Sequence, residues 1–435
     1  MGLAVEGLPA RRAAFWSLKA CFQDGASLDE AFAKQRGDLS GPDAGLAWGI
    51  CQQVARERLR LKRLKRAFIK RSLPKKAADA HIILDIALVE LLFLNVAPHA
   101  AISIAVEQAK THRVPAVKAV SGLINAVLRN VMRRKTSGKF HLPPPQHALP
   151  EWLQKRFKGR YGEGGAEAIA RLYLTEPSLH LSARDAAAKE ALEAVPDFRQ
   201  DGQSALFPPG TPPTGLPGFA EGGYWVQDRA AALPAQVLAP EAGALCYDLC
   251  AAPGGKTLQL AAMGAQVHSV DISAARLERL AQNLERTGLS ADIEAADLIT
   301  WLPPVAAGSV LLDAPCTALG TLRRHPDVVH HRSEKDFATI THTQAALLEK
   351  AWSALAPEGH LVYAVCSLEP EEGCGIIDAF LQAHDDAETV SLKPADYALP
   401  SGCADGHGAL ITPPHLFEEI GGVDGFFIAK LRRTR

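Results

Sequence analysis

Two cysteines follow apolar segments in the last third of the chain, and thiols in such places can do chemistry. Cys316 ends Asp313-Ala-Pro-Cys, after the apolar residues 310–312, and Cys366 follows the apolar residues 361–365. A cysteine in an apolar strand is usually a small core residue, but a thiolate is also a nucleophile that forms covalent intermediates. Ligands bind where the carboxyl ends of parallel strands meet. We therefore expect both thiols at one sheet edge, and covalent catalysis there.

A turn of small residues lies between an apolar run at 244–249 and a helical pattern from Thr257. It consists of Cys250, Ala251, Ala252, Pro253, Gly254, Gly255 and Lys256. Cys250 stands where a P-loop needs glycine, and no G-x-G-x-x-G is present, so both phosphate-binding motifs fail. Small residues let the backbone approach a ligand closely. The turn therefore predicts a cofactor site that does not hold a pyrophosphate.

Three aspartates end further apolar segments: Asp271, Asp297 and Asp313. An acid about 20 residues after the glycine turn holds ribose hydroxyls in sheets of this type, and Asp271 has this spacing. An aspartate at a strand end also caps the following helix in many proteins, so each residue has that alternative. Together with the turn they favour a nucleoside-type cofactor, and S-adenosylmethionine is the leading candidate.

Strands alternate with helices from residue 241 onward. Apolar runs predict strands at 244–250, 266–271, 292–296, 308–313, 359–365, 388–392 and 424–431, and helices at 257–263, 273–287, 334–356 and 370–384. This alternation is typical of a doubly wound, mostly parallel sheet. We expect residues 241–435 to form an α/β Rossmann-like methyltransferase domain.

The preceding residues have other patterns, so the chain is predicted to be multidomain. Residues 1–137 show helical periodicity, with 82–94 the most apolar segment, and predict an all-α bundle. Prolines at 143–145 and 150 predict an extended linker at 138–150. Residues 151–240 predict a small α+β accessory module that binds RNA.

A basic run lies in the predicted bundle. One acid, Glu57, opposes eleven cations: Arg56, Arg58, Arg60, Lys62, Arg63, Lys65, Arg66, Lys70, Arg71, Lys75 and Lys76. A second cluster contains Arg129, Arg133, Arg134 and Lys135. The ordinary explanation of the run is a solvated helix face. The alternative is an RNA-contacting edge, because lysine and arginine neutralise phosphates.

Composition excludes several classes of protein. The 435 residues carry a net charge of −1, so an RNA partner must be met by local charge patches. No run of about 18 uncharged apolar residues predicts a membrane span, and the N-terminus lacks a secretion signal. Eight cysteines without a C-x-x-C predict reduced thiols, a cytoplasmic location and no metal site. We also expect a monomer.

The chain resembles two known families. Residues 248–257, 312–327 and 363–373 resemble the Nop2/Sun RNA cytosine-5 methyltransferases, with 226–228 as that family's entry motif and 424–430 as its closing strand. Residues 86–94, 102–110 and 122–129 resemble the RNA-binding helical domain of the NusB type. The combination is similar to the bacterial members that act on small-subunit ribosomal RNA. It implies methyl transfer from S-adenosylmethionine to C5 of a cytosine in 16S rRNA.

The resemblance also implies roles for the site residues. Residues 250–256 and the three aspartates line the cofactor pocket, with Asp271 at the ribose, Asp297 at the adenine, and Asp313 at the base edge or the methionine moiety. Sequence spacing alone does not say which thiol attacks C6 of cytosine. The Pro-Cys cysteine attacks in DNA cytosine methyltransferases, whereas the resemblance to the RNA family implies that Cys366 attacks and Cys316 assists release.

Further residues have weaker assignments. Lys256 is a candidate for polarising the base or lowering a thiol pKa, and Arg276 for closing over the cofactor. Arg323, Arg324 and His325 are candidates for RNA phosphate contacts. This chain has Thr317-Ala318 where the family commonly has Ser-Gly, which puts the loop geometry in question.

Two other functions compete with this interpretation. One is an RNA-binding ribosome-assembly factor with a degenerate methyltransferase core, although the retained cysteines and aspartates argue against degeneration. The other is a cytosine-5 methyltransferase that acts on another RNA, such as tRNA. The NusB-like domain favours ribosomal RNA by analogy of fold.

Overall fold

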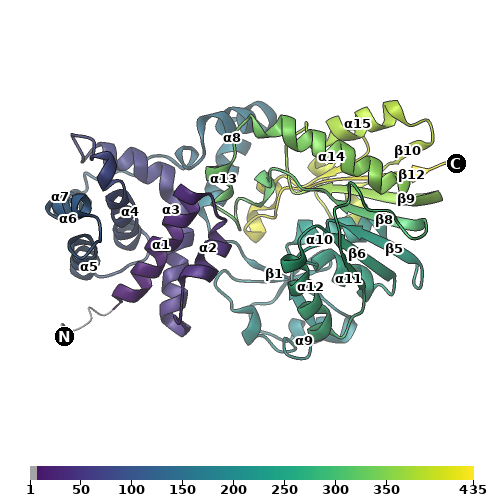
Figure 1. Cartoon of the computed structure of the whole chain (residues 1–435), viewed down its shortest axis with the longest axis horizontal. Coiled ribbons are helices and arrows are strands. Elements are labelled where there is room, and N and C mark those ends of the chain that lie inside the picture. The colour runs from purple at the N-terminus through teal and green to yellow at the C-terminus, as the bar shows by residue number, and fades with distance from the viewer. Residues whose placement is uncertain (1–6) are drawn as a thin grey trace. The chain divides into compact units, whose positions relative to one another are not determined.

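A computed structural model describes residues 7–435 and divides the chain into two compact units (Figure 1). The first unit, here the helical unit, runs to Leu174 and includes the later segment His325–His331. The second, here the sheet unit, contains Thr175–Arg324 and Arg332–Arg435.

The helical unit packs around one buried helix. Its α-helices are α1 (Leu8–Asp24), α2 (Leu28–Gln35), α3 (Gly41–Arg66), α4 (Asp79–Leu92), α5 (Pro98–Lys110), α6 (Pro115–Ala119), α7 (Ser121–Thr136), α8 (Glu151–Leu174) and α13 (Val328–His331). α4 is apolar on nearly all sides and is buried along most of its length. The predictions of an all-α bundle and of a buried helix at 82–94 are therefore confirmed.

Helix α8 belongs to the helical unit, so the predicted boundary at residue 151 was wrong, and residues 151–174 are not part of the middle module. The hydroxyl of Tyr173, near the end of α8, donates to the backbone carbonyl of Ala55 (3.2 Å). Arg56 donates to the carbonyl of Tyr173 (3.4 Å). These contacts join α8 to α3, and sequence periodicity does not reveal such a pairing.

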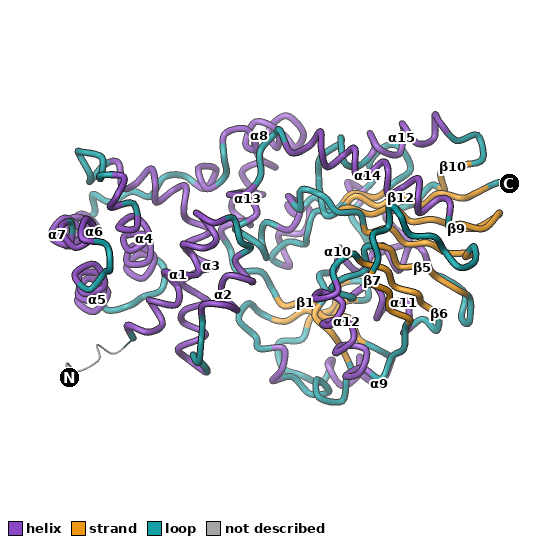
Figure 2. Tube along the Cα trace, viewed as in Figure 1, coloured by secondary structure: helices purple, strands orange, loops and turns teal. Residues whose placement is uncertain are grey.

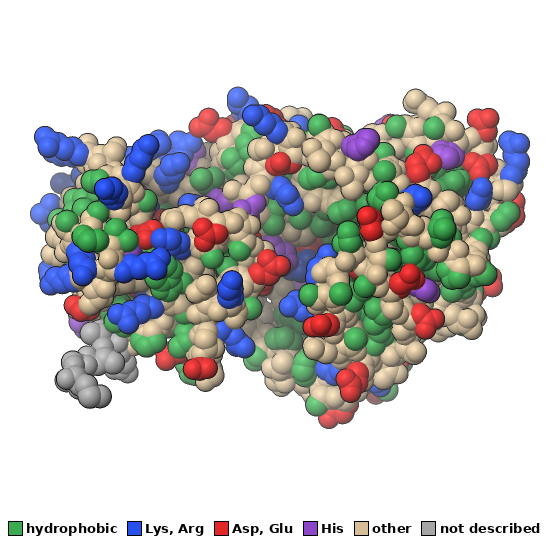
Figure 3. All heavy atoms as spheres, viewed as in Figure 1, with side chains coloured by type: hydrophobic (Ala, Val, Ile, Leu, Met, Phe, Trp, Pro, Cys, Tyr) green, Lys and Arg blue, Asp and Glu red, His purple; other side chains and the backbone are tan. Residues whose placement is uncertain are grey.

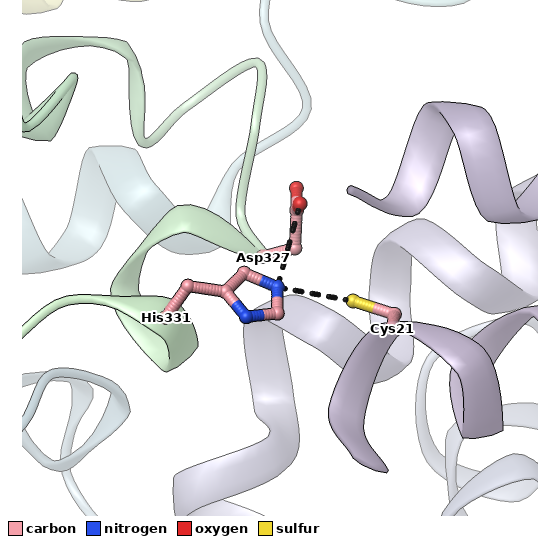
Figure 4. Close-up of side chains that lie close together, drawn as sticks. All are labelled: Cys21, Asp327 and His331. Carbon is pink, nitrogen blue, oxygen red and sulfur yellow. Dashed lines mark hydrogen bonds and ion pairs between the residues drawn. The ribbon is translucent and has the colours of Figure 1, made fainter. Parts of the chain in front are cut away.

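The segment His325–His331 is anchored in the helical unit by side chains distant in sequence (Figure 4). The imidazole Nε2 of His331 lies 3.4 Å from Sγ of Cys21. The carboxylate of Asp327 accepts a hydrogen bond from the N–H of Leu28 at the start of α2 (3.0 Å). Burial raises the pKa of Cys21 to about 12, so the thiol stays protonated at neutral pH.

The sheet unit contains a small antiparallel sheet of four strands in the order β2-β3-β1-β4. The strands are β1 (Leu179–Ala183), β2 (Arg199–Asp201), β3 (Ser204–Phe207) and β4 (Tyr224–Val226), with helix α9 (Ala186–Glu193) between the first two. The chain then enters the large sheet through α10 (Arg229–Leu238).

The large sheet has the order β10-β12-β9-β8-β5-β6-β7 (Figure 2). Its strands are β5 (Leu245–Leu249), β6 (Gln266–Asp271), β7 (Asp292–Ala295), β8 (Ala307–Asp313), β9 (Leu355–Val365), β10 (Ala387–Val390) and β12 (Phe427–Arg433), and the short β11 (Leu410–Ile411) pairs with β12. Strands β5 to β9 pair in parallel, and β12 runs antiparallel to β9 and β10. The predicted doubly wound sheet is confirmed.

Alternating residues of the strands bury opposite faces of the large sheet. Leu361 and Tyr363 pack with α14 (Asp336–Ser353) and α15 (Cys374–Ala383), whereas Val362 packs with α10 on the other face. Both faces are thus covered by helices, which explains why β9 is apolar without interruption. The helices α11 (Gly255–Ala262) and α12 (Ala274–Thr287) follow β5 and β6.

The strand order reverses between β5 and β8, because the chain builds β6 and β7 on one side of β5 and then returns to the other. Ligands of doubly wound sheets bind outside the carboxyl ends of the strands at such a switch point. The turn after β5 and the loop after β8 lie there.

Candidate functional site

The turn after β5 needs glycine at one position. Gly254 has φ 104°, and a Cβ there would lie 2.2 Å from Cδ1 of Leu280. An L side chain at Gly254 would therefore meet both backbone strain and a clash. Gly255 begins α11, and Cys250 is also left-handed, with φ 61°. The result is a tight turn of mostly small residues at the carboxyl end of β5, with two adjacent residues, Gly254 and Gly255, that carry no side chain.

Asp271 is tied to this turn. It is 4% exposed, and its carboxylate accepts hydrogen bonds from the N–H groups of Ala252 (3.0 Å) and Ser273 (2.9 Å). The guanidinium of Arg276 lies 3.8 Å from the same carboxylate and donates to the carbonyl of Ala252. The structure thus brings Asp271, Arg276 and the turn together, although they are separate in sequence.

Lys256 and Asp313 form an ion pair of 2.7 Å across the switch point. Burial by itself lowers the pKa of Lys256. The neighbouring carboxylates, of which Asp313 has the largest effect, raise it by more, so the pKa of Lys256 lies above its ordinary value. Lys256 therefore remains a cation inside the site.

The two cysteines that follow β8 and β9 face each other. Sγ of Cys316 lies 3.2 Å from Sγ of Cys366, and both residues are half-buried. The hydrogen bond to Cys366 raises the pKa of Cys316 well above its ordinary value, and burial and the Glu372 carboxylate add to this effect. Cys316 thus stays protonated at neutral pH.

Glu372 is a fully buried carboxylate that sequence reasoning missed as a site residue. It accepts hydrogen bonds from the N–H (2.7 Å) and the hydroxyl (2.6 Å) of Thr317, from the amide of Gln344 (3.1 Å) and from the hydroxyl of Ser367. Four donors around one carboxylate satisfy its buried charge.

These bonds connect the two cysteine loops, because Thr317 follows Cys316 and Ser367 follows Cys366. Glu372 therefore fixes the positions of Cys316 and Cys366 through its hydrogen bonds to the residues that follow them. The signal in the sequence was weak, because the acid is one of three glutamates in the segment 363–373, and nothing in the sequence distinguishes it from the other two. In the same loop Ala318 adopts φ 59°, a conformation that glycine accepts more easily.

Cys250 differs from the other two site cysteines. Burial raises its pKa to about 12, and the carboxylates of Asp271 and Asp313 add to this effect. Such a thiol is inert at neutral pH. Cys250 thus belongs to the wall of the site as a small side chain.

Asp297 lies at the surface, after the end of β7. Its carboxylate accepts a hydrogen bond from the N–H of Ile299 (3.0 Å), and its carbonyl accepts from Thr300 and Trp301. The bonds of Asp297 therefore shape its own turn, whereas Asp271 and Asp313 contact other site residues.

Two of the arginines proposed for RNA phosphates have internal partners. Arg323 is 3% exposed and donates to Asp228 (3.1 Å), and Arg324 forms a salt bridge with the buried Asp424. The aspartates raise the pKa of Arg324 further although burial lowers it. Arg323 is too buried to meet RNA, so that prediction was wrong for this residue, whereas the side chain of Arg324 is 34% exposed and its contact with RNA stays a prediction. His325 pairs with Asp29 within the helical unit (3.3 Å).

The basic run divides into buried and exposed cations. Arg56, Arg60 and Lys65 are buried; Arg60 pairs with Glu57 (2.8 Å) and Lys65 with Asp85 (2.5 Å). These three were wrongly grouped with the RNA-contacting candidates. The exposed cations of the run are Lys62, Arg63, Arg66, Lys70, Arg71, Lys75 and Lys76.

An exposed apolar residue beside the site was also missed. Ile272 directly follows Asp271 and is 71% exposed. A large apolar side chain in that position offers a flat contact surface to a ligand. Within residues 7–435, no helix is both long and apolar enough to cross a bilayer.

Comparisons with known proteins agree with this architecture. The family model described as 16S rRNA methyltransferase RsmB/F matches residues 235–432, and the NusB family model matches residues 8–133. A ribosomal RNA small subunit methyltransferase B of Pseudomonas syringae pv. tomato is 36% identical over 97% of this chain and 96% of its own length. The enzyme of that name from Klebsiella pneumoniae strain 342 is 34% identical over 98% of both chains.

One solved structure, a methyltransferase homolog protein from Pyrococcus horikoshii, superposes with a TM-score of 0.54 and 26% identity. It covers 65% of this chain and 95% of its own.

Proposed function

Because the chain belongs to the 16S rRNA methyltransferase RsmB/F family, we propose that it methylates C5 of a cytosine in small-subunit ribosomal RNA. The observation that carries this proposal is the pair of thiols, Cys316 and Cys366, 3.2 Å apart at the sheet edge. Methylation of an oxygen or of an exocyclic nitrogen needs no covalent nucleophile, whereas methylation of C5 does.

S-Adenosylmethionine fits the groups at this edge. Gly254 lets the turn pack closely on Leu280 of α12, where a Cβ would clash, and this packing would hold the backbone of the turn in position for the methionine portion. The buried carboxylate of Asp271 suits the ribose hydroxyls, and the exposed Ile272 suits one face of the adenine. Asp297 would then serve the adenine edge. When bound, the cofactor supplies an electrophilic methyl group.

Cys366 is the proposed nucleophile. As a thiolate, it adds to C6 of the cytosine, and the electron pair of the C5–C6 double bond moves toward C5. C5 then has the nucleophilic character that the free base lacks. Lys256 is the cation of this site, and its pKa is raised in spite of burial because of the carboxylates around it, Asp313 first; a cation near a thiolate would stabilise it. Asp313, which holds Lys256, is also placed to accept a hydrogen bond from the cytosine amino group.

Cys316 is the proposed base in the release step. Once Cys366 is bonded to C6, it no longer carries the charge and hydrogen bond that hold the Cys316 proton. Cys316 can then lose its own proton to solvent and accept the proton from C5. Removal of that proton restores the C5–C6 double bond, breaks the S–C6 bond and frees the Cys366 thiolate.

The helical unit is the proposed RNA-binding part. Lys and Arg side chains cover much of the face of this unit drawn in Figure 3. Lys70, Arg71, Lys75 and Lys76 are exposed at the end of the basic run. Exposed cations of this kind contact phosphates and supply sequence-independent affinity.

The test is a map of 5-methylcytosine in total RNA from cells with and without the gene, by bisulfite sequencing. We expect one or more 16S rRNA positions to lose the mark and to regain it with the wild-type chain but not with Cys366→Ala. Cys374→Ala is the matched control, because Cys374 is also half-buried and lies in the same region. A lost mark in tRNA, or no lost mark at all, would contradict the proposal.

A further inference from the structure

The helical unit contains a pocket of about 500 Å³ between α3, α4 and the segment that joins them. This volume lies within the range of roughly 300–1,000 Å³ typical of small-ligand sites. All of its lining residues belong to the helical unit, so it is separate from the cysteine pair.

One wall of the pocket is cationic. Arg58, Lys62 and Arg66 line it from successive turns of α3. Lys65 also lines it, but its charge is matched by the Asp85 carboxylate at 2.5 Å. Three positive charges therefore remain in excess, which favours an anion.

The guanidinium group of Arg58 stacks on the aromatic ring of Phe22. Its guanidinium carbon lies 3.4 Å from the centroid of Phe22, and burial lowers the pKa of this arginine. A half-buried cation stacked on an aromatic ring keeps its N–H donors in a fixed plane, which suits an oxyanion.

Apolar side chains also line the pocket, and they are here called its apolar wall. Ile69 and Leu73 line it from the segment after α3, and Ile82 lines it from α4. An inorganic anion would make no favourable contact with these apolar side chains, and an apolar peptide would leave the cations without an anionic partner. A ligand with a charged group on one side and a flat apolar group on the other fits both walls, and a nucleotide has this form.

We propose that the pocket binds a single unstacked nucleotide of an RNA strand, with its phosphate on the cationic wall and its base against the apolar wall. This inference rests on the proposed function, because it assumes that the ligand is RNA. It goes further in that the pocket would recognise an RNA by its shape, through a base that is not stacked in a helix. Unstacked bases in loops and bulges are the usual targets of specific RNA readers.

The test measures binding of the full chain to three labelled RNA hairpins by fluorescence anisotropy. One hairpin carries a single bulged nucleotide, the second carries an abasic bulge, and the third is fully paired. Burial of about 60 Å² of apolar base surface, at about 25 cal/mol per Å², corresponds to about a tenfold gain in affinity. We expect the wild type to prefer the bulged hairpin over the abasic one by that factor.

Variants separate the two walls. Leu73→Trp and, independently, Ile69→Trp fill the pocket without a change of charge, and each should abolish the preference for the bulged base. The pair Lys62→Gln/Arg66→Gln should weaken binding of the bulged hairpin more than that of the paired hairpin. The control pair Lys70→Gln/Arg71→Gln removes cations that do not line the pocket and should weaken both equally.

Equal affinity of the wild type for the bulged and abasic hairpins would overturn the proposal, as would an unchanged preference in both tryptophan variants. Methylation of ribosomal RNA by the same proteins is measured in parallel. A chain that methylates normally but shows no bulge preference would refute the pocket and leave the proposed function standing.

Discussion

Glu372 provides a test of how the two thiols are positioned. Glu372→Ala would leave two buried donors without this acceptor, the N–H of Thr317 and one N–H of the Gln344 amide, whose nitrogen also donates to the carbonyl of Pro315. Each such group costs about 1–3 kcal/mol, so we expect a loss of folding stability of roughly 2–6 kcal/mol. The loops that carry the cysteines would also separate. A displacement of about 1 Å at a catalytic group costs on the order of 100-fold in rate.

Glu372→Gln should behave differently. Its amide oxygen can still accept from Thr317 and Gln344, and its NH₂ group can donate to the two hydroxyls, which accept as well as donate. The geometry is therefore retained while the negative charge is lost. Because the Glu372 carboxylate contributes to the raised pKa of Cys316, this pKa should fall, and the pH–rate profile should move to lower pH.

The assay is transfer of a radiolabelled methyl group to 16S rRNA over a range of pH, with kcat and KM determined separately. Thermal unfolding of each variant is measured beside it. Glu371→Ala, an exposed neighbour of Glu372, is the control and should match the wild type. A folded Glu372→Ala enzyme with wild-type kcat would refute the positioning role, and so would a glutamine variant with an unshifted profile.

Three further outcomes are expected. Gly254→Ala should weaken the binding of S-adenosylmethionine, measured by calorimetry, by at least about tenfold. The control is Gly288→Ala, because Gly288 also has a positive φ but has open space where a Cβ would lie, and this variant should bind the cofactor as the wild type does. Equal affinities of the two variants would contradict the argument for a tight turn. Lys70→Glu/Arg71→Glu should flatten the salt dependence of RNA affinity, and an unchanged slope would make the exposed part of the basic run a solvated face. Burial raises the pKa of Asp248 to about 7, so the folded protein keeps a proton that the unfolded chain loses near pH 4. Folding stability should therefore fall as pH rises from about 4 to about 7, by roughly 1 kcal/mol per pH unit, and stay constant above pH 7. Denaturant titrations of Asp248→Asn should lack this contribution to the pH dependence of stability. The same pH dependence in the variant and the wild type would contradict the raised pKa of Asp248.

The large sheet was predictable because its central strands, such as β5, β8 and β9, are buried on both faces. Such strands are continuous apolar runs, and the predicted strand limits lie within about four residues of the observed ones. The convergence of Cys316 and Cys366 followed from the rule that parallel strands end at one edge. Thus topology alone located the site.

Side-chain partners were not predictable, because they depend on contacts distant in sequence. In the sequence, Arg323 and Arg324 have the character of phosphate ligands. In the structure, Arg323 donates to Asp228, 95 residues earlier, and Arg324 donates to Asp424, 100 residues later. The role of Glu372 likewise depends on the loop 55 residues earlier that contains Thr317. Charge in a sequence does not show whether that charge is already paired.

The central claim, attack by Cys366 with release assisted by Cys316, is tested most directly by trapping the adduct. Cys316→Ala is incubated with 16S rRNA and S-adenosylmethionine, digested with nuclease and trypsin, and analysed by mass spectrometry. We expect a methylated cytidine nucleotide attached to the peptide that contains Cys366, and no adduct from Cys366→Ala. An adduct formed by Cys366→Ala and attached at Cys316 would contradict the assignment.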